Sequence, residues 1–417
     1  VRNSEIFLTG NSYTCQKAGG FSDTYDRPHE GRGKGRLTHG IVLSSRIQCQ
    51  SCQDMIDLGR GDARSTHCFW RGFALLFKNL LRRGIGVDLG TANTLIYVDK
   101  QGIVLREPSV VAVDDQTNTV RAVGEEARAM LGRTPHGVRA TRPLRDGVIA
   151  EFKYAEYMLK EFLNRVLNGG RGWMAPDIAI GIPCGVTDVE KNAVRQAARS
   201  AGAGQTYLPE EPMAAAIGCS LPVAEPTGSM IVDIGGGTTE VAVVSLSGIV
   251  VNESLRVAGD ELNEAIIRYL KKVHSLAVGE RTAEEIKFRL GSAYKTVDND
   301  RYEVRGLNLI NGLPRTVTIS RGEIREAMVE PLSRVVEAVR RTLERTPPEL
   351  AADIYDRGIM LTGGGARLQG IDELISNETE VPVLIADDPL SCVAIGTGKM
   401  LTDPTYRRVL MQSLCES

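Results

Sequence analysis

The chain has 417 residues, of which 42% are hydrophobic and 24% charged, a composition typical of a globular protein with a large core. This balance excludes an intrinsically disordered chain and a multispanning membrane protein. The formal net charge is -2, with a basic excess in the first 83 residues and an acidic excess in the remainder. The eight cysteines have no regular spacing and favour a reducing compartment, so we expect a cytoplasmic protein.

Residues 1–66 show no sustained helical or strand period and are rich in Gly, Ser and Arg. We assign them no fold and expect either disorder or an extension that the native protein lacks. Cys49 and Cys52 form a CxxC pair, and His67 and Cys68 follow it. One such pair without a second is weak evidence for zinc, so a flexible tail is the favoured interpretation.

Residues 67–83 contain "FWRGFALLFKNLLRR", which predicts an amphipathic helix. At 100° per residue, basic residues gather opposite an apolar face that includes Trp70, Phe73, Phe77 and Leu80. A basic helix with an aromatic face is typical of a segment that lies in an anionic bilayer interface. Such a helix also suits packing on its own protein, and the residues alone leave both options open.

From residue 85 onward, short β-rich runs alternate with helical patterns, which predicts an α/β fold with helices packed on sheets. "IGVDLGTANTLIYVDKQGIVL" (residues 85–105) and "IVDIGGGTTEVAVVSLSGIVV" (residues 231–251) share one design of strand, Asp, small-residue turn and further strands. This duplication predicts two related domains that face each other across a cleft. A third glycine turn, "IMLTGGGARL", occupies residues 359–368.

The glycine turns suit a bound phosphate, because glycine lets backbone N–H groups approach phosphate oxygens and a threonine hydroxyl adds a donor. Asp88 and Asp233 each stand near the end of a strand and would bring negative charge to an anionic ligand. A cation between the carboxylates and the anionic ligand would remove this repulsion, and Mg²⁺ held largely through water suits such a place. Each turn alone is equally compatible with an ordinary tight hairpin, and three such turns together favour a nucleotide site.

The ordered motifs "DLGTANT", "DIGGGTTE" and "LTGGGA" resemble the actin, sugar-kinase and heat-shock-chaperone ATPase superfamily. Further stretches, including "GRTPHGVRATRPLRDGVIAEF", "PEEPMAAAIG" and "DPLSCVAIGTGKML", resemble the MreB family of bacterial actin homologues within it. The resemblance covers residues 85–401. It implies an actin-like ATPase fold, with two duplicated lobes of ribonuclease-H-like core around a nucleotide cleft. The implied divisions are lobe I at 84–228 with a small subdomain at about 112–144, lobe II at 229–401 with one at about 261–324, and a tail at 402–417.

The resemblance also implies site residues for ATP and Mg²⁺. Those on the phosphates would be Thr91, Ala92 and Asn93 from one lobe and Gly235, Gly236 and Gly237 from the other. Those on the adenosine would be Glu284, Glu285, Ile286 and Lys287, with Gly363, Gly364, Gly365 and Ala366 beneath the base. From pattern alone, residues 284–287 are a solvated helical face.

Catalysis implied by the resemblance is hydrolysis of ATP by water that Glu211 orients, with help from Thr238 and with Asp88 and Asp233 facing the magnesium. Glu210 is the alternative to Glu211. The acidic pair before Pro212 is also what a helix start requires, since acids favour the first turn and proline is tolerated there. Both interpretations hold together if the helix start faces the cleft.

The loop "NGGRGWMAPD" (residues 168–177) places Trp173 and Met174 between a predicted helix and strand. A loop tryptophan is either packed inward or exposed for a purpose, and the resemblance favours insertion into a membrane. Together with the helix at 67–83, it implies a peripheral protein on the inner face of the cytoplasmic membrane. Polar replacement of Trp70, Phe73 and Trp173 should then release the protein from anionic liposomes.

The function implied is an ATP-dependent, membrane-associated filament that organises cell-wall synthesis and maintains rod shape. Its partners would be other copies of the chain and membrane proteins of wall elongation, with no nucleic acid. Two alternatives from the same superfamily remain, a monomeric kinase of a small molecule and a scaffold that ATP switches between shapes. Light scattering with Mg-ATP separates the filament protein from these two alternatives, because only the filament protein should form polymers.

Overall fold

The structure is a computed structural model that describes residues 5–9, 12–16, 22–25, 84–167, 175–295, 300–406 and 408–411. The chain divides into two units, Val1–Ala74 and Leu75–Ser417. In the first unit, three antiparallel strands form a sheet in the order β1-β2-β3, with bounds β1 Glu5–Thr9, β2 Ser12–Gln16 and β3 Ser22–Tyr25. The CxxC pair, the predicted amphipathic helix with Trp70, Phe73, Phe77 and Leu80, and the loop residues Trp173 and Met174 lie outside the described residues.

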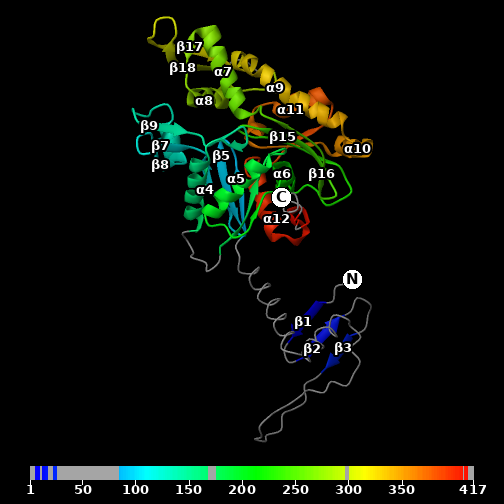
Figure 1. The fold of residues 1–417 in the computed structure, drawn as a ribbon. Coiled ribbons are helices and arrows are strands. Elements are labelled where there is room, and N and C mark those ends of the chain that lie inside the picture. Colours follow the sequence, from blue (N-terminus) through cyan, green and yellow to red (C-terminus); the bar gives the residue numbers. More distant parts are fainter. Residues whose placement is uncertain are drawn as a thin grey trace. The chain divides into compact units, whose positions relative to one another are not determined.

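The larger unit contains two five-stranded sheets, and the first belongs to lobe I (Figure 1). Its strand order is β13-β12-β4-β5-β6, with β4, β5 and β6 antiparallel and β12 and β13 added in parallel. The bounds are β4 Gly84–Leu89, β5 Asn93–Val98, β6 Gly102–Pro108, β12 Asp177–Gly181 and β13 Thr206–Tyr207. Central strand β4 buries Ile85, Val87 and Leu89 on one face, and on the other face Gly86 is buried where the backbone of helix α12 (Cys392–Thr402) approaches it.

The second sheet, in lobe II, has the order β16-β15-β14-β20-β21 and repeats that arrangement strand for strand. Even the irregularity recurs, since the second strand of each lobe is bulged against the third, at Ile96/Tyr97 and at Val243/Val244. The bounds are β14 Ser229–Ile234, β15 Thr239–Ser245, β16 Gly248–Leu255, β20 Ile359–Thr362 and β21 Val383–Ile385. The predicted duplication of an α/β domain is therefore confirmed.

Helices occupy matching places in the two lobes. In lobe I, α4 precedes β12 and α5 joins β12 to β13, while in lobe II α9 and α10 precede β20 and α11 joins β20 to β21. Helix α7 leads from the sheet of lobe II into its smaller part. The bounds are α4 Phe152–Leu167, α5 Asp188–Ser200, α7 Gly259–His274, α9 Arg321–Glu344, α10 Pro348–Arg357 and α11 Ile371–Thr379.

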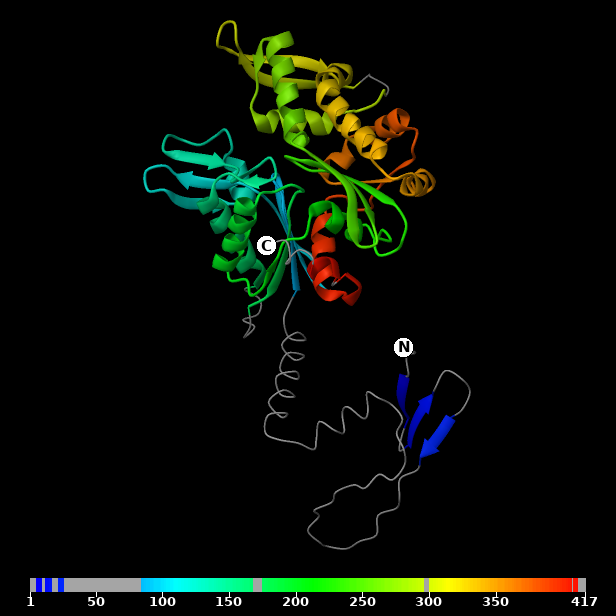
Figure 2. The same ribbon diagram turned by 45° about the vertical axis from the view of Figure 1, so that its right-hand side comes forward.

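Each lobe also carries a small three-stranded sheet with a helix (Figures 1 and 2). The small sheet of lobe I has the order β8-β7-β9, and that of lobe II has the order β17-β18-β19. In lobe I the bounds are β7 Val111–Asp114, β8 Thr119–Val123, α3 Glu125–Met130 and β9 Val138–Thr141, followed by the hairpin β10 Leu144–Arg145 and β11 Val148–Ile149. In lobe II they are β17 Leu276–Ala277, α8 Glu280–Leu290, β18 Arg301–Asn308 and β19 Pro314–Ser320.

Two helices, α6 (Glu211–Gly218) and α12 (Cys392–Thr402), join the lobes, and Figures 1 and 2 show them side by side. Helix α6 follows the sheet of lobe I but contacts β14 and β15 of lobe II, whereas α12 follows the sheet of lobe II but contacts β4 and β12 of lobe I. Small residues permit this crossing. A Cβ added at Gly396 would lie 1.7 Å from the carbonyl oxygen of Ala214, so the two backbones are in direct contact.

Candidate nucleotide-binding site

The first phosphate loop joins β4 to β5 at the inner end of the lobe I sheet. The hairpin register pairs Leu89 with Thr94, which leaves residues 90–93 between the paired ends to make the turn. Ser109 holds this turn, because its hydroxyl donates to the carbonyl oxygen of Gly90 over 2.6 Å and its amide donates to that of Ala92 over 3.0 Å. The predicted residues Thr91, Ala92 and Asn93 therefore lie on a braced turn at the end of the strand that carries Asp88.

The second loop joins β14 to β15 and is the counterpart in lobe II. Ile234 pairs with Thr239, and the amide of Gly235 donates to the carbonyl oxygen of Thr238 over 2.8 Å. The first turn of α7 fastens the loop from behind, since the amide of Asp260 donates to the carbonyl oxygen of Gly236 over 2.8 Å. The three glycines thus form an anchored loop.

The two loops meet. A Cβ added at Gly236 would lie 2.7 Å from the Cβ of Ala92, and one added at Gly237 would lie 2.7 Å from Oγ1 of Thr91. Thr91 is buried and accepts a hydrogen bond from the amide of Gly147 over 3.1 Å. The structure therefore brings together the phosphate-contacting residues that the sequence predicts from both lobes, with glycine at the points of closest approach.

Acidic side chains collect at the bases of these loops. Asp233 is buried in β14, and Asp88 takes the equivalent place in β4. Burial, reinforced by the charge of Asp233, raises the pKa of Asp88 to about 8, and burial raises that of Asp233 to about 7. Two carboxyl groups with raised pKa values, with the charge of Asp233 acting on Asp88, form a site that a cation would stabilise.

Asp88 and Asp233 fit a magnesium ion that is held largely through water, which is the arrangement the sequence predicts. Among the described residues, no group of three or more His, Cys, Asp or Glu is arranged to hold a metal by itself. Asp88 and Asp233 would supply one or two carboxylate oxygens, and an Mg²⁺ ion takes its remaining ligands from water and phosphate in such sites.

Glu211 is the first residue of α6, and its place is set by the edge of the lobe I sheet. Its amide donates to the carbonyl oxygen of Ile182 over 2.8 Å, and a Cβ added at Gly181 would lie 3.2 Å from its Cγ. Burial raises the pKa of Glu211 well above its ordinary value, with further contributions from Asp88, Glu240 and Asp233. Glu210 is the N-cap residue of α6 and pairs in a bridge with Ile182, so the helix-start interpretation and the site interpretation hold together.

Thr238 is buried on the lobe II side of the junction, next to Gly147 of lobe I. A Cβ added at Gly147 would lie 2.8 Å from both Cγ2 of Thr238 and Cγ of Pro183. The predicted catalytic set of Glu211, Thr238, Asp88 and Asp233 therefore lies around the junction of the two loops. Their catalytic roles remain a prediction.

The third glycine turn lies against the second. Gly363 has φ 80°, and a Cβ there would lie 2.3 Å from Oδ1 of Asp233. A Cβ at Gly365 would lie 2.2 Å from Cγ2 of Ile234, and Ala366 is buried in the core of lobe II. Residues 363–366, which include Gly364, are therefore packed beside the second phosphate loop, and only glycine fits where they meet.

The predicted adenosine segment on α8 has its side chains on different faces. Lys287 donates from Nζ to the carbonyl oxygen of Gly259 over 2.7 Å, and burial lowers its pKa. Glu284 accepts from Arg128 over 3.0 Å. Ile286 lies in the core of lobe II, and Glu285 accepts from the hydroxyl of Tyr302 over 2.9 Å. Glu284 and Lys287 therefore lie by the second loop and lobe I, whereas Ile286 and Glu285 are engaged elsewhere.

Glu240 is a buried acid that the sequence analysis did not single out. Its Oε1 accepts from the hydroxyl of Ser254 over 2.6 Å, and its Oε2 accepts from the amide of Cys184, in lobe I, over 3.3 Å. Burial raises its pKa to about 7. A lone acid directly after "GGGTT" in an otherwise apolar strand was the signal that could have revealed it.

Comparisons with known proteins agree with this geometry. Residues 82–408 match the family model of the MreB/Mbl protein. The chain is 49% identical over 322 residues to the cell shape-determining protein Mbl of Bacillus subtilis (strain 168), covering 77% of this chain and 96% of the relative. It is 51% identical over 329 residues to the cell shape-determining protein MreB of Escherichia coli (strain K12), covering 78% and 95%.

Solved structures show the same likeness. MreB5 of Spiroplasma citri bound to ADP superposes with a TM-score of 0.74 at 37% identity, covering 78% of this chain and 98% of that one. The MamK double helical filament has a TM-score of 0.66 at 21% identity, covering 76% and 98%, and so shares the fold.

Proposed function

The chain belongs to the MreB/Mbl family, and from that premise we propose that it is an ATP-dependent, membrane-associated filament protein that organises cell-wall synthesis and maintains rod shape. The observation that carries the ATP-dependent part is the meeting of two phosphate loops from sibling lobes, with Asp88 and Asp233 at their bases. The related MreB5 of Spiroplasma citri has been solved with ADP and with AMPPNP.

In the proposed site, the backbone amides of Gly236 and Gly237 and the hydroxyl of Thr91 would hold the polyphosphate from opposite lobes, while the amide of Gly235 closes the loop on Thr238. Asp88 and Asp233 would hold Mg²⁺ mainly through water, and the ion when bound would neutralise phosphate charge. Glu211 would orient a water molecule for in-line attack on the γ-phosphorus, with Thr238 beside it. The bond to the β–γ bridging oxygen breaks, and ADP and inorganic phosphate are the products.

Assembly is the proposed use of this cycle. The relatives at about half identity carry cell shape-determining names, and the fold is shared with a protein solved as a double helical filament. Other copies of the chain are therefore the first proposed partner, and membrane proteins of wall elongation are the second. A small-molecule kinase or an ATP-switched scaffold is the alternative that the experiment below has to exclude.

Sedimentation and light scattering test the assembly. We expect Mg-ATP to shift the full chain into the pellet and to raise the scattered light, with no such change when nucleotide or magnesium is withheld. Asp233→Asn is the matched variant, since it keeps the size of the side chain and removes the charge expected to face magnesium. A chain that binds Mg-ATP in calorimetry yet stays monomeric at all concentrations would favour the kinase or scaffold alternative.

Membrane attachment, and with it a location on the inner face of the cytoplasmic membrane, is proposed for the segment 67–83 and the loop with Trp173 and Met174. Among the residues that the structure describes, no helix is long and apolar enough to cross a bilayer. Replacing Trp70, Phe73 and Trp173 by serine should release the chain from anionic vesicles. Ile310→Ser is the control, because Ile310 is an 80% exposed apolar residue on the hairpin of β18 and β19. Equal release by both variants, or by neither, would contradict the proposal.

A further inference from the structure

Three ion pairs connect the small sheet region of lobe I directly to lobe II. Arg142, just after β9, donates from Nη1 to Oδ1 of Asp260 over 2.9 Å, and its Nη2 lies 2.8 Å from Oε1 of Glu280. Arg128, on α3, donates from Nη2 to Oε2 of Glu284 over 3.0 Å. Both arginines belong to lobe I, and all three acids stand in α7 or α8 of lobe II.

We propose that Arg128 and Arg142 form an electrostatic latch that holds the lobes closed, and that opening of this latch limits the release of nucleotide. The proposal rests on the proposed function insofar as it concerns nucleotide. The closed state of the latch itself is a property of the chain alone.

The latch is connected to the second phosphate loop through one turn of helix. Asp260 binds Arg142 with its carboxylate, while its amide donates to the carbonyl oxygen of Gly236 over 2.8 Å. The preceding residue, Gly259, donates to the carbonyl oxygen of Gly235 over 3.2 Å and accepts from Nζ of Lys287 over 2.7 Å. A movement that separates Asp260 from Arg142 is therefore transmitted through the start of α7 to residues 235 and 236 of the loop expected to hold the phosphates.

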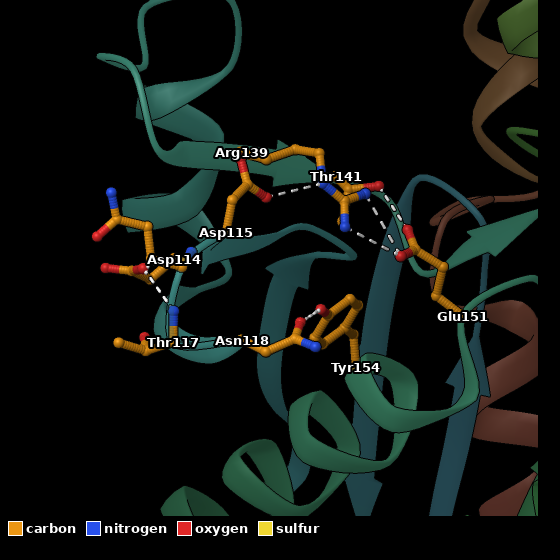
Figure 3. A network of polar contacts seen from close by, with 9 residues as sticks. Asp114, Asp115, Thr117, Asn118, Arg139, Thr141, Glu151 and Tyr154 are labelled. Carbon is orange, nitrogen blue, oxygen red and sulfur yellow. Dashed lines mark hydrogen bonds and ion pairs between the residues drawn. The ribbon is translucent and has the colours of Figure 1, made fainter.

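The lobe I side of the latch is braced against the body of its lobe. Figure 3 shows Arg139, three residues before Arg142, reaching Asp115 and Glu151. Thr141 donates to the same Glu151 over 2.8 Å, and the hydroxyl of Tyr154 on α4 donates to Oδ1 of Asn118 over 2.5 Å. The small sheet consequently moves with α4, so separation of the lobes has to break the arginine contacts.

The exposure of the pairs makes the latch reversible. Arg142 keeps only 15% of its side chain exposed, but its partners Asp260 and Glu280 keep 32% and 47%. Asp260 and Glu280 regain water when the lobes part, so opening leaves neither of these carboxylates buried and unpaired. Partly exposed pairs are also weakened by salt, which predicts that opening becomes easier as ionic strength rises.

The test measures the nucleotide-free chain and the loaded chain separately. In the first measurement, hydrogen–deuterium exchange with mass spectrometry follows the peptides that contain α3 and the first turns of α7 and α8. In the second, stopped-flow fluorescence follows the release of a fluorescent ATP analogue, with magnesium, after mixing with excess ATP. The variants are Arg128→Gln, Arg142→Gln and the double variant, each compared with wild type at low and high potassium chloride.

Arg121→Gln is the matched control, because Arg121 forms an ion pair with Asp114 inside the same small sheet and reaches no residue of lobe II in that contact. The expected result is faster amide exchange at α3, α7 and α8 and release faster by about two- to fivefold per arginine, since a partly exposed ion pair shifts an equilibrium by up to about that factor. The salt dependence of release should shrink in the double variant. The control should leave both measurements unchanged.

A charge exchange separates a latch from a merely structural role. Arg128→Glu and Glu284→Arg should each speed amide exchange in the nucleotide-free chain, and the two together should restore it toward wild type, because the attraction is rebuilt with reversed sign. Exchange without nucleotide is the readout here, because Glu284 is also an expected adenosine contact. Unchanged exchange and unchanged release in Arg128→Gln and Arg142→Gln would overturn the latch. If the wild type binds no nucleotide, the proposed function fails, and the hydrogen-exchange arm still decides the latch by the same criterion.

Discussion

The two lobes repeat one strand order, yet their phosphate loops present opposite surfaces to each other. The lobe I loop carries the side chains of Thr91, Ala92 and Asn93, whereas the lobe II loop is bare backbone at Gly235, Gly236 and Gly237. A Cβ at Gly236 would lie 2.7 Å from that of Ala92, so there is room for side chains on one loop only. Duplicated hairpins thus diverge at the place where they meet.

The helices that join the lobes behave differently. Both α6 and α12 carry small residues where they cross, since a Cβ at Gly218 would lie 1.9 Å from the carbonyl oxygen of Cys392, and one at Gly396 would lie 1.7 Å from that of Ala214. Here the contact is symmetric, because each helix packs its backbone on the other. The two phosphate loops therefore meet with side chains on one loop only, whereas α6 and α12 meet with small residues on both helices.

The largest expected effect comes from bulk at this joint. Gly396→Val should lower the free energy of unfolding by about 3 kcal/mol or more, because its Cβ would overlap a helix backbone that cannot turn aside. Thermal unfolding of the full chain measures it. Gly279→Ala is the control, since a Cβ there meets nothing within 4 Å. Equal stability of the two variants would show that the joint is not tightly packed.

The second largest effect is expected on the rate of ATP hydrolysis, for which only one of the two joining helices supplies a residue. Helix α6 begins with Glu211, whereas α12 begins with Cys392, so of these two helices only α6 begins with an acid at the site. Glu211→Gln should lower the rate of ATP hydrolysis about 100-fold while nucleotide affinity stays near wild type, since positioning of water acts in the transition state. Phosphate release and calorimetry provide the two numbers. Should Glu210→Gln lose the activity instead, the neighbouring acid has the role.

The loop asymmetry predicts a smaller effect that a second change should partly reverse. Gly236→Ala should weaken nucleotide affinity by about tenfold, because its Cβ would press on Ala92 and displace the loop. Adding Ala92→Gly moves the one available side chain to the other lobe and should recover part of the affinity. Calorimetric titration with Mg-ATP checks both. An additive double variant, with no recovery, would mean that the loops do not compete for the same space.

Helix capping should show the smallest effect and the same one in both lobes. Thr187 caps α5 in lobe I and Ser320 caps α9 in lobe II, each in a reciprocal box with a glutamate three residues later. Thr187→Ala and Ser320→Ala should each cost about 1 kcal/mol, because one helix N–H group loses its acceptor. Chemical denaturation measures the difference from wild type. Clearly unequal losses would show that the surroundings of each cap, and not the shared capping box, set its contribution to stability.

Much of the fold could be predicted from the sequence because strand, glycine turn and strand recur in order. The repeat at residues 85–105 and 231–251 predicted sibling domains, and the two sheets confirm it with one shared topology. The exchange of α6 and α12 between lobes was not predictable, since their small residues read equally well as helix interior. Only the structure reveals this exchange, through the contact of Gly218 with Cys392.

The site was predictable to a similar degree. Asp88, Asp233 and the glycine loops follow from motif and spacing, and the structure places them together. On α8, the motif treated four neighbours alike, while the fold buries Ile286 and turns Glu285 toward Tyr302, because successive helical residues point about 100° apart. Glu240 was not predicted, because its partners Ser254 and Cys184 lie in other strands and loops and no local motif connects them to it.

By itself, the sequence determined that this chain builds two glycine-turn lobes with an acid at the base of each, because local patterning sets strands and turns. Tertiary structure alone decided which residues of the two lobes meet. The glycines of the lobe II loop contact Ala92, and the acid Glu240 contacts Cys184. Arg128 and Arg142 contact the acids of α7 and α8. The physical reason is that such contacts join residues more than fifty positions apart, whose distance is set by packing of whole elements and not by the local chain.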